Sequence, residues 1–276
     1  MWTLTAFADE IADDLGEQCS TLAGLGMSHL EFRGAWGTNV ADLSDAEVDR
    51  AAETMATAGI SVSCIGSPVG KVPVTTDPAE HLARLDRCIE IARRFDAPFI
   101  RVFSFYPMPA RPVEDSGAAV RQRVAAMADR VAGTGITLLH ENEKGIYGDT
   151  PQRCHELLDA VDSPSLRAAW DPANFVQVGV DRPFDTGFAM MRPHLAYVHV
   201  KDARSGSGEV VPAGAGDGQV RQLLTALRDD GFDGFFSLEP HLARAGAHGG
   251  FSGPELFTVA HDAFTALLDD LHVAYH

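Results

Sequence analysis

The chain has 276 residues, of which 45% are hydrophobic, and its 22 Lys and Arg against 39 Asp and Glu give a formal net charge of −17. This acidity opposes binding to nucleic acid, because affinity for the phosphate backbone comes from an excess of Lys and Arg, and it also opposes binding to an anionic membrane surface. The N-terminal residues show no basic stretch before an apolar run, and nowhere do about 18 apolar residues follow one another, so neither a signal peptide nor a membrane span is predicted. Four cysteines without a CxxC pair predict reduced thiols in a cytoplasmic protein.

Short apolar runs alternate with longer amphipathic stretches eight times along the chain. Several of the runs contain β-branched or aromatic residues and are flanked by turn signals, which indicates strands. In chain order the predicted strands are Thr3–Ala8, His29–Phe32, Ser61–Ile65, Phe99–Phe103, Thr137–Glu141, Arg167–Asp171, Ala196–Val200 and Phe235–Glu239. The predicted helices between and after them are Asp13–Leu25, Ser44–Ala58, Pro78–Phe95, Val113–Ala132, Pro151–Ala160, Phe184–Met191, Val220–Asp230 and Pro254–Leu271.

The alternation of strands and helices predicts the fold class. Ser44 and Glu47 fit a capping box at the start of one helix, and glycines such as Gly59 follow helices just before the next strand. Repeated βα units imply parallel strands joined by right-handed crossovers. Eight of them favour a closed (β/α)8 TIM barrel, and without a linker residues 1–276 are predicted to form a single domain. An open dinucleotide-binding sheet is not favoured, because no GxGxxG follows the first predicted strand.

The active site of such a barrel lies at the C-terminal ends of its strands. The last four predicted strands place Glu141, Asp171, His199 and Glu239 at or near these ends. Any one of these residues alone is more often solvated or hydrogen-bonded than functional, but three carboxylates converging on one point would repel each other without a cation. Three carboxylates and one imidazole suit Mn²⁺ or Mg²⁺, and they also accept Co²⁺ or Zn²⁺. The sequence therefore predicts a divalent metal site formed by these four residues.

The first half of the barrel offers cations near the same rim. Arg33 follows the second predicted strand, Lys71 lies in the loop after the third, and Arg101 lies in the fourth. They could bind hydroxyls or an acidic group of a substrate, or they could instead pair with Glu10 and Glu31. Two glycine-containing loops near the C-terminus are either flexible covers of the site or solvated turns. These loops are Arg204–Gly218 and Leu242–Gly253.

Several short motifs together resemble one protein superfamily. They are FADEI at 7–11, HEN at 140–142, WDPAN at 170–174, YVHVKD at 197–202 and SLEPH at 237–241. The set resembles the xylose-isomerase-like sugar phosphate isomerase/epimerase superfamily, the TIM-barrel type of AP endonuclease family 2, over essentially the whole chain. The motifs are specific for the superfamily and not for a substrate.

The resemblance implies a metal-dependent isomerase or epimerase that acts on a sugar, a sugar phosphate or a keto-polyol. One divalent ion, expected to be Mn²⁺, would be held by Glu141, Asp171, His199 and Glu239. Glu141 and Glu239 would also move protons on opposite faces of the substrate, through a metal-stabilised cis-enediolate.

The chain departs from the ketose epimerases at two positions and adds a third polar residue. Asn174 stands where those enzymes often have His, and Lys201 lies near the place where they have Arg, with Arg204 further on. His241 is an extra polar residue after the last strand. Asn174, Lys201 and His241 complete the predicted substrate-binding set with the three cations of the first half.

Other functions remain open at this point. A dehydratase or lyase on a keto-inositol or keto-sugar would use the same site and the same chemistry. An abasic-site endonuclease would need more histidines in a suitable pattern and a basic face, and a non-catalytic sugar-binding barrel would not need both glutamates. Barrels of this class often associate, so a homo-oligomer is a further open expectation.

Overall fold

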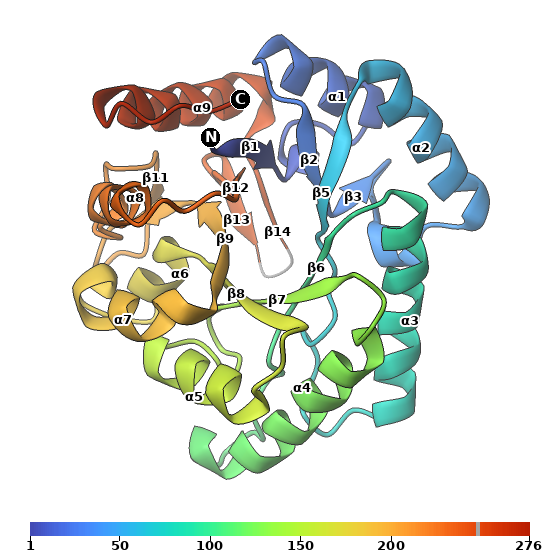
Figure 1. Ribbon diagram of the computed structural model, residues 1–276, viewed down its shortest axis with the longest axis vertical. Helices are drawn as coiled ribbons and strands as arrows, with labels where there is room; N and C mark the ends of the chain where they lie inside the picture. Colours follow the sequence, from blue (N-terminus) through green and yellow to red (C-terminus); the bar gives the residue numbers. More distant parts are fainter. Residues whose placement is uncertain (247–248) are drawn as a thin grey trace.

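The computed structural model describes residues 1–246 and 249–276, and its centre is an α/β barrel of eight parallel strands (Figure 1). The barrel strands are β1 (Thr3–Ala6), β2 (His29–Phe32), β5 (Ser61–Ile65), β6 (Phe99–Val102), β7 (Thr137–Glu141), β8 (Leu166–Trp170), β9 (Leu195–Val200) and β12 (Phe235–Leu238). Their hydrogen-bonded order is β1-β12-β9-β8-β7-β6-β5-β2, and the two strands at the ends of this order contact each other, which closes the sheet. The predicted TIM barrel is confirmed.

Helices surround this barrel on its outer face (Figure 1). They are α1 (Leu15–Gly24), α2 (Asp45–Ala58), α3 (Pro78–Arg94), α4 (Gly117–Val131), α5 (Pro151–Val161), α6 (Pro172–Gln177), α7 (Pro183–Met191), α8 (Val220–Asp229) and α9 (Gly253–Asp270). The predicted capping box is present, because the Ser44 side chain accepts from Glu47 N while the Glu47 carboxylate accepts from Ser44 N. In the described part of the chain, every helix is too short or too polar to cross a membrane.

Several predicted boundaries shift by one or two residues, and one predicted helix begins later than expected. The predicted helix Val113–Ala132 starts with the 3-10 turn Val113–Ser116 and continues as α4. The strand β8 ends at Trp170, because the next residue, Asp171, caps the short helix α6. The hydrophobic periodicity of the sequence did not predict this helix. Pro172 at the first position of α6 is the signal that could have revealed it.

Three small antiparallel hairpins lie outside the barrel sheet. They are β3 (Gly34–Ala35) with β4 (Thr38–Asn39), β10 (Asp202–Ala203) with β11 (Val210–Val211), and β13 (Arg244–Gly246) with β14 (Gly249–Phe251).

The loop Arg204–Gly218 is ordered around one buried carboxylate. The Asp202 side chain accepts the backbone N–H groups of Ala203, Gly214, Gly216 and Gly218 at 2.9 to 3.0 Å. These hydrogen bonds fix the C-terminal part of the loop, whereas residues 204–207 are exposed to solvent. Of the other predicted loop, Leu242–Gly253, residues 247–248 lie outside the described residues.

Gly70 lies where the loop after β5 packs against the segment that follows β6. A Cβ atom added to Gly70 would meet the backbone oxygen of Phe103 at 2.0 Å, and its φ of +91° already disfavours side chains. We expect Gly70→Ala to lower the free energy of unfolding by about 2–5 kcal/mol, the sum of backbone strain and overpacking.

Gly133 provides the matched control for this prediction. Its φ is +74° and no atom lies within 4 Å of an added Cβ, so Gly133→Ala should cost only the strain of about 1–2 kcal/mol. Urea unfolding of the two variants measures the difference. Equal losses in both would show that the contact with Phe103 relaxes without cost.

Candidate metal centre

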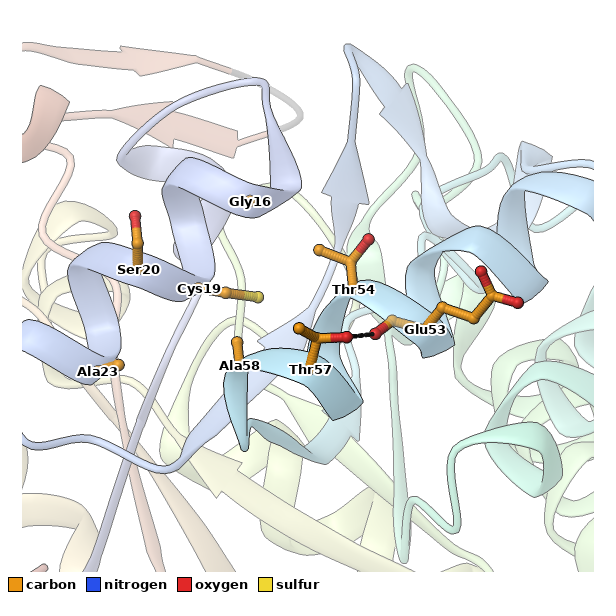
Figure 2. A pocket seen from close by; sticks show the side chains of 8 residues that line it. All are labelled: Gly16, Cys19, Ser20, Ala23, Glu53, Thr54, Thr57 and Ala58. Carbon is orange, nitrogen blue, oxygen red and sulfur yellow. Dashed lines mark hydrogen bonds between the residues drawn. The ribbon is translucent and has the colours of Figure 1, made fainter.

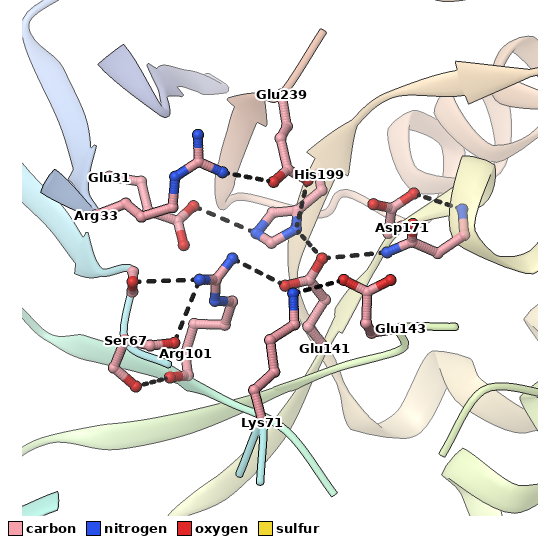
Figure 3. Close-up of polar contacts among 12 residues, drawn as sticks. Glu31, Arg33, Ser67, Lys71, Arg101, Glu141, Glu143, Asp171, His199 and Glu239 are labelled. Carbon is pink, nitrogen blue, oxygen red and sulfur yellow. Dashed lines mark hydrogen bonds and ion pairs between the residues drawn. The ribbon is translucent and has the colours of Figure 1, made fainter. Parts of the chain in front are cut away.

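Four buried side chains from four consecutive barrel strands converge at one rim. Glu141 ends β7, Asp171 follows β8, His199 lies in β9 and Glu239 follows β12. One possible ligand atom from each lies within 4.8 Å of all the others, and all four residues are buried (Figure 3). Parallel strands end at the same edge of the barrel, which brings residues from distant parts of the sequence to one point.

Two asparagines hold the ends of β7 and β8 together. The Asn142 side chain donates to Asp171 O at 2.8 Å and accepts from Asp171 N at 2.9 Å. Asn174 Nδ2 donates to Asn142 O at 2.9 Å and to Glu141 Oε1 at 3.3 Å, while its backbone N–H is capped by Asp171 Oδ1. The structure thus places Asn174, a predicted substrate residue, in direct contact with Glu141. Asn142 is a residue that the sequence reasoning missed, although it stands in the HEN motif.

Two arginines pair with the carboxylates of the rim. Arg101 Nη1 donates to Glu141 Oε2 at 3.1 Å, and Arg33 Nη1 donates to Glu239 Oε1 at 3.0 Å (Figure 3). Arg33 Nε also donates to Asp9 Oδ2 at 2.8 Å. Both predicted cations therefore lie at the cluster and form ion pairs with its glutamates, and Arg33 also pairs with Asp9 and, at a longer distance, with Glu10.

Two lysines make corresponding pairs. Lys201 Nζ lies 2.6 Å from Asp171 Oδ2 and 2.9 Å from Glu239 Oε2, so its ammonium bridges two of the four clustered residues. Lys71 Nζ donates to Glu143 Oε2 at 2.8 Å, beside the cluster. Lys201 is thus a buried counter-charge, whereas the side chain of Lys71 keeps 10% of its surface exposed.

His241 and Glu10 form a second group next to Glu239. His241 Nε2 lies 3.2 Å from Glu10 Oε1 and 3.3 Å from Glu239 Oε1. The other oxygen of Glu10 accepts from His241 N and from the Ser252 hydroxyl. The sequence also allowed Glu10 to pair with a cation of the first half of the barrel. The structure shows this pair with Arg33, whose Nη2 lies 3.9 Å from Glu10 Oε1. Burial raises the pKa of Glu10 to about 8 although Arg33 opposes this shift.

The buried charges of the cluster shift one another's ionisation. Burial raises the pKa of Asp171 to about 7, and the charge of Lys201 offsets part of that shift. Burial opposes ionisation of Glu141 as well, but the neighbouring His199 and Arg101 lower its pKa to about 2. The carboxylates therefore depend on positive groups beside them, a role that a divalent cation also fills.

The donor set and its unsatisfied atoms fit a divalent cation. Asp171 Oδ1 is used by the cap of α6, and Oδ2 has the Lys201 ammonium as its ion-pair partner. Among the described residues, both ring nitrogens of His199 have no hydrogen bond of good geometry. His199 Nδ1 faces the clustered glutamates, 3.1 Å from Glu141 Oε1 and 3.9 Å from Glu239 Oε2. Three carboxylates and one imidazole are a donor set that Mn²⁺ and Mg²⁺ accept.

A separate surface cavity of about 650 Å³ lies between α1 and α2 (Figure 2). Its walls are made by Gly16, Cys19, Ser20, Ala23, Glu53, Thr54, Thr57 and Ala58. None of the predicted site residues lines it, and it contributes nothing to the cluster at the barrel rim.

One protein family shares the sequence pattern of this barrel. The family described as xylose isomerase-like TIM barrel matches residues 19–257. The chain belongs to this family. The resemblance predicted from the motifs is confirmed.

Similar proteins include an epimerase and two solved TIM-barrel structures. The chain is 31% identical over 176 residues to 2-epi-5-epi-valiolone 7-phosphate 2-epimerase of Actinoplanes sp., a match that covers 62% of this chain and 61% of that enzyme.

A xylose isomerase-like TIM barrel protein from Mycobacterium smegmatis, solved in complex with magnesium, superposes with a TM-score of 0.76 at 18% identity, over 98% of this chain and 97% of that chain. A D-tagatose 3-epimerase-like protein gives a TM-score of 0.78 at 15% identity, over 98% of both chains. At such identities the two structures show a common fold alone. The protein is thus a xylose isomerase-like TIM barrel whose buried Glu, Asp and His residues form a cluster of the metal-site type.

Proposed function

We propose that the protein is a divalent-metal-dependent isomerase or epimerase of a sugar, a sugar phosphate or a keto-polyol. The observation that carries this proposal is the buried cluster of three carboxylates and one imidazole at the catalytic rim of the barrel. Membership of the xylose isomerase-like family and the similarity to 2-epi-5-epi-valiolone 7-phosphate 2-epimerase support it.

We propose that Glu141, Asp171, His199 and Glu239 hold one divalent ion, with Mn²⁺ preferred and Mg²⁺, Co²⁺ or Zn²⁺ as alternatives. When bound there, the ion would polarise a substrate carbonyl and the neighbouring hydroxyl. Glu141 and Glu239 act as the acid and base, one removing the proton α to the carbonyl and the other returning a proton on the opposite face. Return of the proton to the same carbon gives epimerisation, and return to the neighbouring carbon gives isomerisation.

The residues proposed to bind the substrate differ in how accessible they are. Lys71 and His241 each keep 10% of their side-chain surface exposed, whereas the side chains of Arg33, Arg101 and Lys201 are at most 6% exposed. We therefore propose Lys71 and His241 as the first contacts for substrate hydroxyls. The three more deeply buried cations, together with Asn174, act closer to the reacting carbons and hold the catalytic carboxylates in place.

Solvent isotope exchange tests the proposed reaction. Purified protein is assayed for bound metal and then incubated in D₂O with a panel of ketoses, ketose phosphates and keto-polyols. We expect deuterium at a carbon next to the carbonyl together with an epimer or isomer of the substrate. Elimination of water from the same substrates would favour the dehydratase alternative. Turnover that is undiminished in metal-free protein would contradict the metal-dependent mechanism.

A further inference from the structure

The imidazole of His199 lies between two different sets of carboxylates. Its Nδ1 faces Glu141 and Glu239, which belong to the proposed metal site. Its Nε2 faces the other way, 3.3 Å from Oε2 of Glu31, and both side chains are 0% exposed (Figure 3). Each ring nitrogen therefore has a distinct partner, and the two nitrogens are not equivalent.

Glu31 is a buried carboxylate that has no role in the proposed reaction. It lies in β2, where the pairing with β5 shifts register between Leu30 and Glu31, an irregularity that re-aims side chains near active sites. Among the described residues, neither of its oxygens has a hydrogen bond of good geometry. The nearby thiol of Cys64, whose pKa is raised by burial and by the charge of Glu31, is only a weak donor. A proton on His199 Nε2 would give this carboxylate the strong donor that it lacks.

We propose that Glu31 is a positioning residue of the metal site, which accepts the Nε2–H of His199 and so directs an unprotonated Nδ1 at the cation. This inference rests on the metal site of the proposed function and extends it to a residue outside the four ligands. A neutral imidazole carries a single N–H, so an acceptor at Nε2 leaves Nδ1 free for a metal. The same hydrogen bond fixes the orientation of the ring and raises the basicity of the ligating nitrogen.

The hydroxyl groups in the interior of the barrel lie within hydrogen-bond distance of one another. They therefore do not take the place of Glu31 as the partner of His199 Nε2. The Tyr197 hydroxyl lies 3.0 Å from Ser63 Oγ, which in turn lies 2.7 Å from Thr5 Oγ1 and donates to Leu30 O. These groups lie in the same interior and are buried like Glu31. Ser63 is therefore a suitable control position, because it is polar and interior, and its hydrogen bonds among the described residues are with Thr5, Leu30 and Tyr197 and not with His199.

Metal affinity gives the first test. Mn²⁺ and Zn²⁺ are titrated into metal-free protein carrying Glu31→Gln, Glu31→Leu or, as the control, Ser63→Ala. We expect the dissociation constant to rise about 10- to 100-fold in Glu31→Leu, the range typical of lost outer-shell partners. Glu31→Gln keeps an acceptor oxygen without the charge and should lose less. Ser63→Ala should bind as the wild type does.

The protonation site of His199 gives a second test, and its first measurement is made on the protein without any substitution at Glu31. In ¹⁵N-labelled protein loaded with diamagnetic Zn²⁺, the His199 resonances are assigned by comparison with His199→Asn. We expect the ring proton on Nε2 and the metal on Nδ1, and we expect Glu31→Leu to lose the protection of that proton from exchange with solvent. A ring proton on Nδ1, or unchanged affinity in Glu31→Leu, would overturn the role of Glu31. Failure of the wild type to bind metal would instead overturn the proposed function.

Discussion

Glu141→Gln and Glu239→Gln should each lower the rate of epimerisation by about 100- to 10,000-fold, the usual contribution of a positioned acid or base. Glutamine has nearly the shape of glutamate but cannot accept the proton from the carbon next to the carbonyl. The rate is measured as product formation and as deuterium incorporation, starting in turn from each of the two epimers. Full activity in both variants would show that these carboxylates do not transfer protons.

Loss of metal must be separated from loss of proton transfer, because both glutamates are also proposed ligands. The metal content of each variant is therefore measured under assay conditions. A variant that keeps its metal and loses turnover has lost the acid or base, whereas one that loses both has lost a ligand. Glu156→Gln, at an exposed position of α5, controls for the chemical change and should keep normal turnover.

Removing the imidazole of the cluster is expected to abolish tight metal binding. His199→Ala deletes one of the four proposed ligands, so its affinity for Mn²⁺ should fall by more than the roughly 10- to 100-fold typical of outer-shell changes. Metal bound to the folded state stabilises it, by about 2.7 kcal/mol at a free concentration of 100 times the dissociation constant. Thermal unfolding with and without Mn²⁺ should therefore show a stabilisation in the wild type that His199→Ala lacks.

His140 supplies the control for that experiment. It precedes Glu141 in β7, so its side chain points to the opposite face of the strand. Its ring lies beside Gly148, where an added Cβ would meet it at 2.5 Å. Burial lowers the pKa of His140 to about 4, so this ring is neutral at physiological pH. His140→Gln should keep the stabilisation by Mn²⁺. A loss as large as that in His199→Ala would contradict the assignment of the metal to His199.

The barrel itself could be predicted from the sequence because its signals are local. Apolar runs of strand length, helix caps such as Ser44 with Glu47, and the glycines that follow helices all depend on neighbours within a few residues. Eight such units leave few arrangements other than a closed parallel barrel. The boundaries were less certain where a side chain had two roles. Asp171, for example, reads as the end of a strand and is in fact the cap of α6.

The four clustered residues could also be predicted, since they stand at equivalent positions of parallel strands. Alternation along β7 places Glu141 and His140 on opposite faces, so the sequence already separated the two. The neighbours of each residue at the rim were not predictable. Arg33 and Arg101 were expected either to bind a substrate or to pair with Glu10 and Glu31, and Lys201 was expected to bind a substrate. The structure shows each of the three paired with a clustered carboxylate.

The sequence by itself determined the barrel and the residue types that stand at its rim, because strand period, helix caps and turn residues act over short distances. Only the tertiary structure decided which charges meet. The pairing of Arg33 with Glu239 and the approach of Glu31 to His199 join residues that lie far apart in the sequence. Such contacts depend on how the barrel closes and on the register of its strands, and those are set by packing of the whole core rather than by any local pattern.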